Sequence, residues 1–230
     1  MQRGNYAYSY SFLRAMSSAI SDPSSSSAPA DPLAVNPAKA RIVAAARVHF
    51  FTHGFRNVTM DCLAEELGMS KKTLYAHFTS KTEILEAVLY DQCARVQADL
   101  DQVSRGCADD FTGCLQQLLA CAQRYTGEIQ PPFIRDMARE APEMFAIITR
   151  RRREILEQSF GRLFNEGRRA GFIRQDLPVK LILEILLGAV EAVVNPVKMN
   201  ELDLTPKTGF SSIISVVLRG IVTEEGRAKL

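Results

Sequence analysis

Apolar residues recur every three or four positions along most of the chain, and no stretch alternates for long between apolar and polar side chains. This repeat places apolar side chains on one face of an α-helix, whereas a half-buried strand needs strict alternation. The pattern therefore predicts an all-α fold without a sheet. The expected helices cover approximately residues 37–53, 60–67, 71–78, 81–105, 110–127, 131–141, 143–170, 178–195 and 208–225.

Residues with strong capping preferences mark the ends of several expected helices. Asn36, which precedes a proline, suits an N-cap, and Gly54 suits a left-handed C-cap. Ser80 and Glu83 have the spacing of a capping box. Residues 197–207 lie between two helical patterns and are predicted to form a loop.

The first 36 residues differ from the rest of the chain. They include the run SDPSSSSAPADPLAVNP, which is rich in Ser, Pro and Ala and has no periodicity. A segment of this composition buries too little apolar surface to fold, so we predict a disordered arm over residues 1–36. Met16 is an alternative start of the protein. The remainder is predicted to form two domains, at residues 37–83 and 84–230.

Charge is balanced over the whole chain but not locally. The 28 Lys and Arg residues against 26 Asp and Glu give a formal net charge of +2, which argues against a generally basic nucleic-acid-binding surface. Residues 37–83 hold seven of the basic residues and four of the acidic ones. Positive charge is therefore concentrated in the predicted N-terminal domain, and any nucleic-acid site should be a local patch there.

A short predicted helix in that domain lies within the stretch GMSKKTLYAHFTSK, residues 68–81. Ser70 is a good N-cap, and the preceding helix and glycine turn complete a helix-turn-helix pattern. A recognition helix contacts base edges mainly through its N-terminal residues, which are here Lys71 and Lys72. Lysine donates to guanine O6 and N7 in the major groove, so these two side chains are candidate base readers.

Other polar side chains of the same stretch suit phosphate oxygens, which position a protein on DNA without reading its sequence. Thr73, Tyr75 and His77 each carry a donor, and Lys81 lies at the amide end of the next helix, which favours an anion. A solvated helix face is the plainer interpretation of any one of these residues. Their combination in one capped element favours DNA.

The segment ARVHFFTHGFRNVTMDCLAEELGMSKKTLYAHFTSKTEILEAVL, residues 46–89, resembles the tetracycline-repressor (TetR) family of bacterial transcriptional regulators. The resemblance implies that the short helix enters the major groove, where Lys71, Lys72 and Ala76 meet the bases. The phosphate contacts that it implies come from Thr59, Thr73, Tyr75, His77 and Lys81. It also implies that a larger C-terminal helical domain binds a ligand and forms the dimer.

The expected function is a ligand-responsive, DNA-binding transcriptional regulator, specifically a repressor that a small molecule releases from a palindromic operator. The implied partners are double-stranded operator DNA, an unknown small-molecule effector and a second copy of the chain. The rival interpretation is a helical small-molecule-binding protein without DNA-binding activity. An enzyme is a third interpretation, which the sequence disfavours because it has no P-loop, no glycine-rich nucleotide motif and no HExxH, and its three histidines all lie in the first domain.

Apolar stripes in the second domain provide material for both a dimer interface and a pocket. The predicted interface residues are Ile185, Leu186, Ala189, Val193, Ile214, Val217 and Leu218. Ile182 belongs to the first of these stripes but is not assigned to the interface. The candidate pocket residues are Phe111, Leu115, Leu118, Met137, Met144, Phe145, Ile148 and Phe160. Any of these side chains could instead pack in the core of its own subunit.

The cysteines and remaining charges suggest no further chemistry. Cys107, Cys114 and Cys121 recur every seven residues, so two of them on one helix would lie about 10 Å apart, too far to share a metal ion. We expect small buried side chains there, without a metal or cofactor. Five cysteines without paired spacing fit a reducing cytoplasm better than a disulfide framework. The run of four arginines at 150–153 is interpreted as a solvated helix face, with an anionic ligand or DNA as the alternative, and no segment is predicted to span a membrane.

Overall fold

A computed structural model of the protein describes residues 36–105 and 110–224. Contacts divide the chain into two compact units, residues 1–40 and 41–230. In the described part of the first unit, the Asn36 side chain accepts hydrogen bonds from the backbone N–H groups of Ala38 and Lys39, both at 3.1 Å, as its predicted N-cap role requires. The predicted arm, apart from Asn36, and Cys107 lie outside the described residues.

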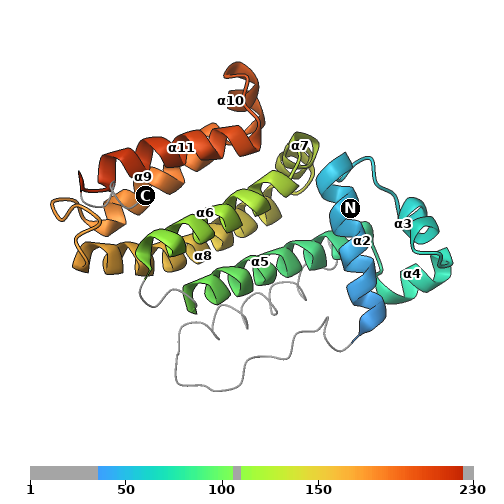
Figure 1. Ribbon diagram of the computed structural model, residues 1–230. Coiled ribbons are helices and arrows are strands. Elements are labelled where there is room, and N and C mark those ends of the chain that lie inside the picture. Colours follow the sequence, from blue (N-terminus) through green and yellow to red (C-terminus); the bar gives the residue numbers. More distant parts are fainter. Residues whose placement is uncertain (1–35, 106–109, 225–230) are drawn as a thin grey trace. The chain divides into compact units, whose positions relative to one another are not determined.

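The described residues form helices and no strand, which confirms the predicted all-α class (Figure 1). The helices are α2 Pro37–His53, α3 Met60–Glu66, α4 Lys71–His77, α5 Lys81–Arg105, α6 Phe111–Glu128, α7 Pro131–Glu140, α8 Pro142–Arg169, α9 Val179–Val193, α10 Pro196–Glu201 and α11 Pro206–Ile221. An isolated bridge joins Ile173 and Val222. The predicted domain boundary between residues 83 and 84 falls inside α5, and residues 41–230 form one compact unit. The division into two domains at this point therefore stays a prediction.

The predicted loop at residues 197–207 is wrong in its first half, which belongs to α10. The Asn195 side chain caps this helix by accepting a hydrogen bond from the Lys198 backbone N–H at 3.0 Å, and Pro196 provides a fixed first position. A second cap follows, since Thr205 and Thr208 form a reciprocal capping box at the start of α11. Both signals are local, and the short capped helix α10 takes up part of the segment where a loop was expected.

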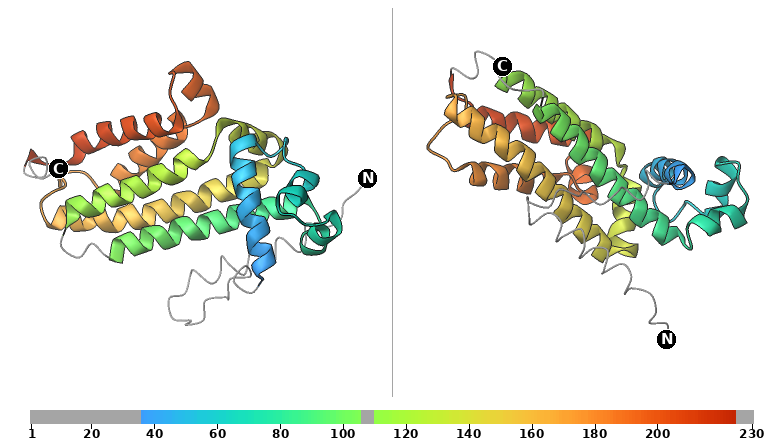
Figure 2. Two further views of the ribbon diagram at one scale, coloured as in Figure 1. Left: turned by 45° about the vertical axis from the view of Figure 1, so that its right-hand side comes forward. Right: turned by 90° about the horizontal axis from the view of Figure 1, so that it is seen from below.

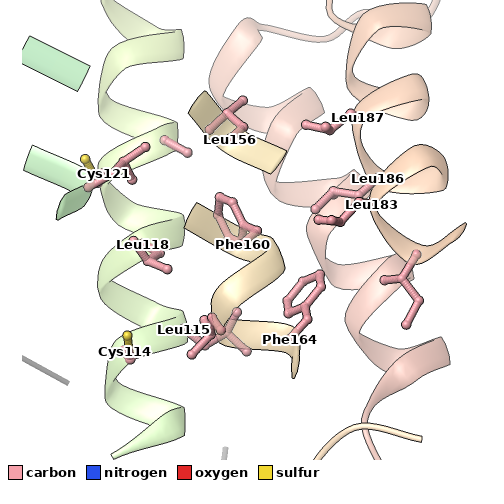
Figure 3. Packing of buried hydrophobic residues seen from close by; sticks show 14 of the residues in the cluster. Cys114, Leu115, Leu118, Cys121, Leu156, Phe160, Phe164, Leu183, Leu186 and Leu187 are labelled. Carbon is pink, nitrogen blue, oxygen red and sulfur yellow. The ribbon is translucent and has the colours of Figure 1, made fainter. Parts of the chain in front are cut away.

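The longer helices of the second unit run side by side (Figures 1 and 2). Helix α5 packs on α6 and α8, and α9 packs on both α8 and α11. Their shared core contains apolar side chains from α6, α8 and α9 that face one another in Figure 3. Phe164 is 1% exposed and Leu118 is fully buried, so this core is tightly filled by large side chains.

Apolar residues of α2, α3 and α4 hold the helix-turn-helix together. Phe50, Leu63 and Leu74 are fully buried, and one of them comes from each helix. Gly68 has φ of 62°, which a left-handed turn between α3 and α4 requires and glycine adopts without steric cost. The turn and the buried side chains fix how α4 projects from the helices beneath it.

Candidate functional site

Helix α4 presents its polar side chains outward because only one of its residues is fully buried. The Ser70 side chain caps the helix by accepting a hydrogen bond from the Thr73 backbone N–H at 3.1 Å. Leu74 fixes the inner face. The outer face carries Lys71, Lys72, Thr73, Tyr75 and Ala76, all exposed, and His77 is half-buried. The structure therefore brings most of the predicted DNA-contacting residues onto one surface.

The two lysines that were predicted to read bases have different surroundings. The Lys71 ammonium lies 2.6 Å from an Asp61 carboxylate oxygen, and this hydrogen bond raises the pKa of Lys71. Lys72 has no ion-pair or hydrogen-bond partner within the described ranges 36–105 and 110–224. Lys72 is thus available to a ligand, whereas Lys71 must first leave its carboxylate.

Two of the residues predicted to contact phosphates have a local structural role. The Thr59 side chain caps α3 by accepting a hydrogen bond from the Cys62 backbone N–H at 3.2 Å, and Thr59 is exposed. The Lys81 ammonium donates to the carbonyl oxygens of Phe55 at 2.8 Å and Val58 at 3.0 Å. It also lies 4.2 Å from the centre of the Phe55 ring. Burial lowers the pKa of Lys81.

Replacing Lys81 by methionine is expected to lower the free energy of unfolding by about 1–3 kcal/mol, because two carbonyls lose a charged donor. Urea denaturation followed by circular dichroism measures this. If Lys81 contacts a phosphate as well, the slope of log affinity against log salt concentration should fall by about 1. An unchanged free energy of unfolding would contradict the structural role.

A small cavity of about 50 Å³ lies among α2, α5, α6 and α8. It is lined by Phe51, Leu89, Gln92, Cys93, Val96, Tyr125, Ile129, Ile148, Arg152 and Ile155. Of the predicted pocket residues only Ile148 is among them. A wider depression of about 540 Å³ lies beside His49 and Cys62 and is more open to the surface, so the smaller cavity is the better candidate for a specific small molecule.

The other predicted pocket residues lie elsewhere in the second unit. Leu115, Leu118, Met137 and Phe160 are buried, and three of these belong to the main hydrophobic core. The Phe111 ring stacks on Phe172 with the ring centres 5.1 Å apart. Met144 and Phe145 are partly buried. Sequence spacing identified apolar helix faces but did not distinguish a filled core from the cavity wall.

The sequence pattern did not identify the polar groups at the cavity. It only allowed an anionic ligand as an alternative interpretation of the four arginines at 150–153. An Arg152 Nη2 donates to the Thr126 hydroxyl at 2.7 Å, and the Gln92 amide nitrogen donates to Glu128 at 3.2 Å. Burial raises the pKa of the Cys93 thiol to about 11. The signal that could have found Arg152 is its position in α8 three residues before the buried Ile155 and four before the buried Leu156.

The predicted dimer-interface residues do not share one exposed surface. Leu186 is 3% exposed and packs in the hydrophobic core of the chain, so its assignment to the interface is wrong for this structure. Ile185 beside it is 51% exposed. The remaining predicted interface residues are partly buried against the core: Ala189, Val193, Ile214, Val217 and Leu218. The exposed apolar residues of α9 and α11 also include Leu181 and Val216.

Ile182 of α9, which was not assigned to the interface, is 1% exposed. It packs in the same core cluster as Leu186, four residues further along one face of the helix. Ile182 therefore belongs to the interior of the chain, and this face of α9 contributes to the core.

Within residues 36–105 and 110–224, no three His, Cys, Asp or Glu side chains are grouped so that they could hold a metal ion. The helices found there are also too short or too polar to cross a membrane. Cys62, Cys93 and Cys121 are free thiols, but Cys114 is disulfide-bonded, so the expectation of unpaired cysteines is wrong at that position.

Comparison with known proteins agrees with the helix-turn-helix. Residues 42–88 match the family model described as bacterial regulatory proteins of the tetR family. The chain is 31% identical over 87 residues to the HTH-type transcriptional regulator TtgR of Pseudomonas putida, a match that covers 35% of this chain and 39% of TtgR. It is 24% identical over 192 residues to the HTH-type transcriptional regulator UidR of Escherichia coli K12, covering 81% of this chain and 94% of UidR.

Solved structures share the fold over most of the chain. The regulatory protein TetR from Rhodobacter sphaeroides aligns with a TM-score of 0.61 and 18% identity, covering 79% of this chain and 97% of that chain. The complex of SmeT with triclosan aligns with a TM-score of 0.60 and 17% identity, covering 82% and 93%. At these identities the likeness establishes the fold. Together with the match of residues 42–88, it shows that the chain carries the helix-turn-helix domain of bacterial regulatory proteins of the tetR family, followed by helices that share the fold of such regulators.

Proposed function

We propose that the protein is a homodimeric, ligand-responsive repressor that a small molecule releases from a near-palindromic operator. The observation that supports this function most is the geometry of α4. A serine cap and a buried leucine hold the short helix so that Lys72, Thr73 and Tyr75 project from its outer face. A helix of this size fits the major groove, which is about 12 Å wide.

The exposed residues divide into proposed base readers and phosphate contacts. Lys72 is the first base reader, because its ammonium is unpaired within the described residues and lies near the helix N-terminus. Lys71 can join it once DNA competes for Asp61. Phosphate contacts are proposed for side chains of α4 and for residues at the starts of α3 and α5. These residues are Thr59, Thr73, Tyr75, His77 and Lys81.

The dimer is proposed to form through α9 and α11. These helices pack on each other, and their outer faces expose Leu181, Ile185 and Val216 at 44%, 51% and 73%. Leu181 and Ile185 are four residues apart and therefore lie on one face of α9. Two copies related by a two-fold axis would cover this apolar surface and place two α4 helices on one DNA duplex.

An effector is proposed to bind at the smaller cavity and to act through α5. This helix has 25 residues, so it extends about 37 Å from the helix-turn-helix along the second unit. The α5 residues that line the cavity are Leu89, Gln92, Cys93 and Val96. One relative in fold supports regulation by a small molecule, since SmeT is named as the repressor of a multidrug efflux pump and was solved with triclosan.

The base-reading role predicts different results for the two adjacent lysines. Lys72→Ala is expected to weaken binding to the operator by about 1–3 kcal/mol and to leave binding to random DNA nearly unchanged, because it removes a contact to a base. Lys71→Ala is the matched control and should cost less, since the wild-type side chain must break its contact with Asp61 before it binds DNA. Fluorescence anisotropy with operator and random duplexes measures both.

Equal losses on operator and random DNA for Lys72→Ala would refute its base-reading role. The operator itself is found by footprinting the wild-type protein on the DNA upstream of its own gene. If the wild-type protein forms no complex with that DNA or with sites selected from a random pool, the alternative holds, namely a small-molecule-binding protein without DNA-binding activity.

A further inference from the structure

Arg152 differs from the arginines on either side of it in having no carboxylate partner. Arg151 pairs with Glu154 at 3.2 Å, and Arg153 pairs with three glutamates of α8 and α9 at 2.5 to 3.0 Å. Within residues 36–105 and 110–224, no carboxylate oxygen lies within 4.0 Å of the Arg152 guanidinium. Its one hydrogen bond goes to the neutral Thr126 hydroxyl.

Arg152 is half-buried at the cavity described above. Burial lowers the pKa of its guanidinium, although Glu191 favours the charge from further away. A guanidinium nevertheless stays protonated in proteins, so the cavity holds a positive charge with reduced hydration. The Arg152 guanidinium has five N–H donors, but it makes only one hydrogen bond to the described residues.

Gln92 supplies a second unused polar atom at the same cavity. Its amide nitrogen donates to a Glu128 carboxylate oxygen, which can only accept, so this contact fixes the orientation of the amide. The Gln92 carbonyl oxygen is buried and has no hydrogen-bond partner in the part of the chain that the structure describes. Most of the remaining wall is apolar: Phe51, Leu89, Val96, Ile129, Ile148 and Ile155.

We propose that this cavity is the recognition end of a site for an apolar carboxylic acid, whose carboxylate binds the Arg152 guanidinium in a bidentate contact. The apolar body of the ligand lies against the wall, and a hydroxyl or amide donor on it can reach the Gln92 carbonyl oxygen. The proposal rests on the proposed function and names the chemical class of the effector. A planar guanidinium matches the two oxygens of a carboxylate and gives charge-assisted hydrogen bonds.

The present cavity volume indicates how such a ligand would act on DNA binding. About 50 Å³ holds a few water molecules, whereas sites for small molecules usually measure about 300–1,000 Å³, so binding must displace part of the wall. Phe51 of α2 is part of that wall, and its ring centre lies 4.9 Å from that of Phe133. Glu128 accepts from both Gln92 and Arg47 of α2. Displacement at the cavity is therefore coupled directly to α2, the helix that precedes the helix-turn-helix.

The test is a calorimetric titration of the full-length protein with octanoate and phenylacetate, and with the corresponding neutral amides. We expect both carboxylates to bind the wild-type protein and the amides to bind about tenfold or more weakly, since they lack the charge that Arg152 needs. Arg152→Met should lose about tenfold or more in carboxylate affinity, and Arg152→Lys should lose less. Arg151→Met is the matched control, because it removes an adjacent arginine that pairs outside the cavity.

Equal carboxylate affinity in the wild type and Arg152→Met, or equal affinity for acids and amides, would overturn the proposal, as would no carboxylate binding at millimolar concentration. Operator affinity of every variant is measured without ligand to show that each is folded. A wild type that binds operator but neither acid leaves the proposed function intact and refutes this inference. The acids could also bind through Arg152 and leave operator binding unchanged. This result would support the anion site and refute its role in DNA release.

Discussion

Ile185→Glu is expected to make the protein monomeric and to weaken operator binding by about a hundredfold or more. In the proposed dimer, Ile185 lies on the surface that α9 presents to the second subunit, and it is 51% exposed in the isolated chain. The two-fold axis would bring two such glutamates together, and each would be buried without a partner. A monomer also loses the gain in avidity from linking two DNA-binding helices, which is typically about 10²–10⁴.

Sedimentation velocity measures the oligomeric state of this variant, and a mobility shift with operator DNA measures its binding. Leu202→Glu is the matched control, because Leu202 is 54% exposed but lies just after α10, outside the two helices of the proposed interface. It should remain dimeric and bind the operator as the wild type does. A dimeric Ile185→Glu with full operator affinity would remove α9 from the interface. Glutamate at Leu186 would instead unfold the subunit, because this side chain is buried in the subunit's own core.

Phe164→Ala is expected to lower the free energy of unfolding by about 3–5 kcal/mol. The ring is 1% exposed in the core cluster that joins α6, α8 and α9, and the helices cannot collapse fully into the space that it leaves (Figure 3). Because a protein typically has only about 5–15 kcal/mol of stability, this variant should be close to unfolding at growth temperature.

Urea denaturation followed by circular dichroism measures the change, at one protein concentration for all variants since dimerisation adds to stability. Val48→Ala is the control, because Val48 is 57% exposed on α2, and its effect should stay within about 0.5 kcal/mol. A loss below about 1 kcal/mol for Phe164→Ala would show that the core relaxes around the missing ring.

The helix class, most helix ends and the helix-turn-helix follow from the sequence alone. These features depend on interactions between residues three or four positions apart, which a linear pattern contains. The Ser70 side chain, for example, bonds the Thr73 backbone, and Gly68 makes the turn before it. Even the missed helix α10 has a local N-cap at Asn195, so its absence from the prediction reflects a cap that was interpreted as the end of the preceding helix.

The packing of the folded chain determines which apolar residues fill the core and which charged side chains form ion pairs. Leu186 and Ile185 are equally apolar and adjacent, yet the packing of α9 on α8 and α11 buries the first and exposes the second. The sequence pattern does not distinguish the three arginines at 151–153. In the structure, Arg153 forms ion pairs with two glutamates of α9, whereas Arg152 lines a cavity. Such differences depend on partners that lie 30 to 40 residues away in the chain, and the fold alone brings them together.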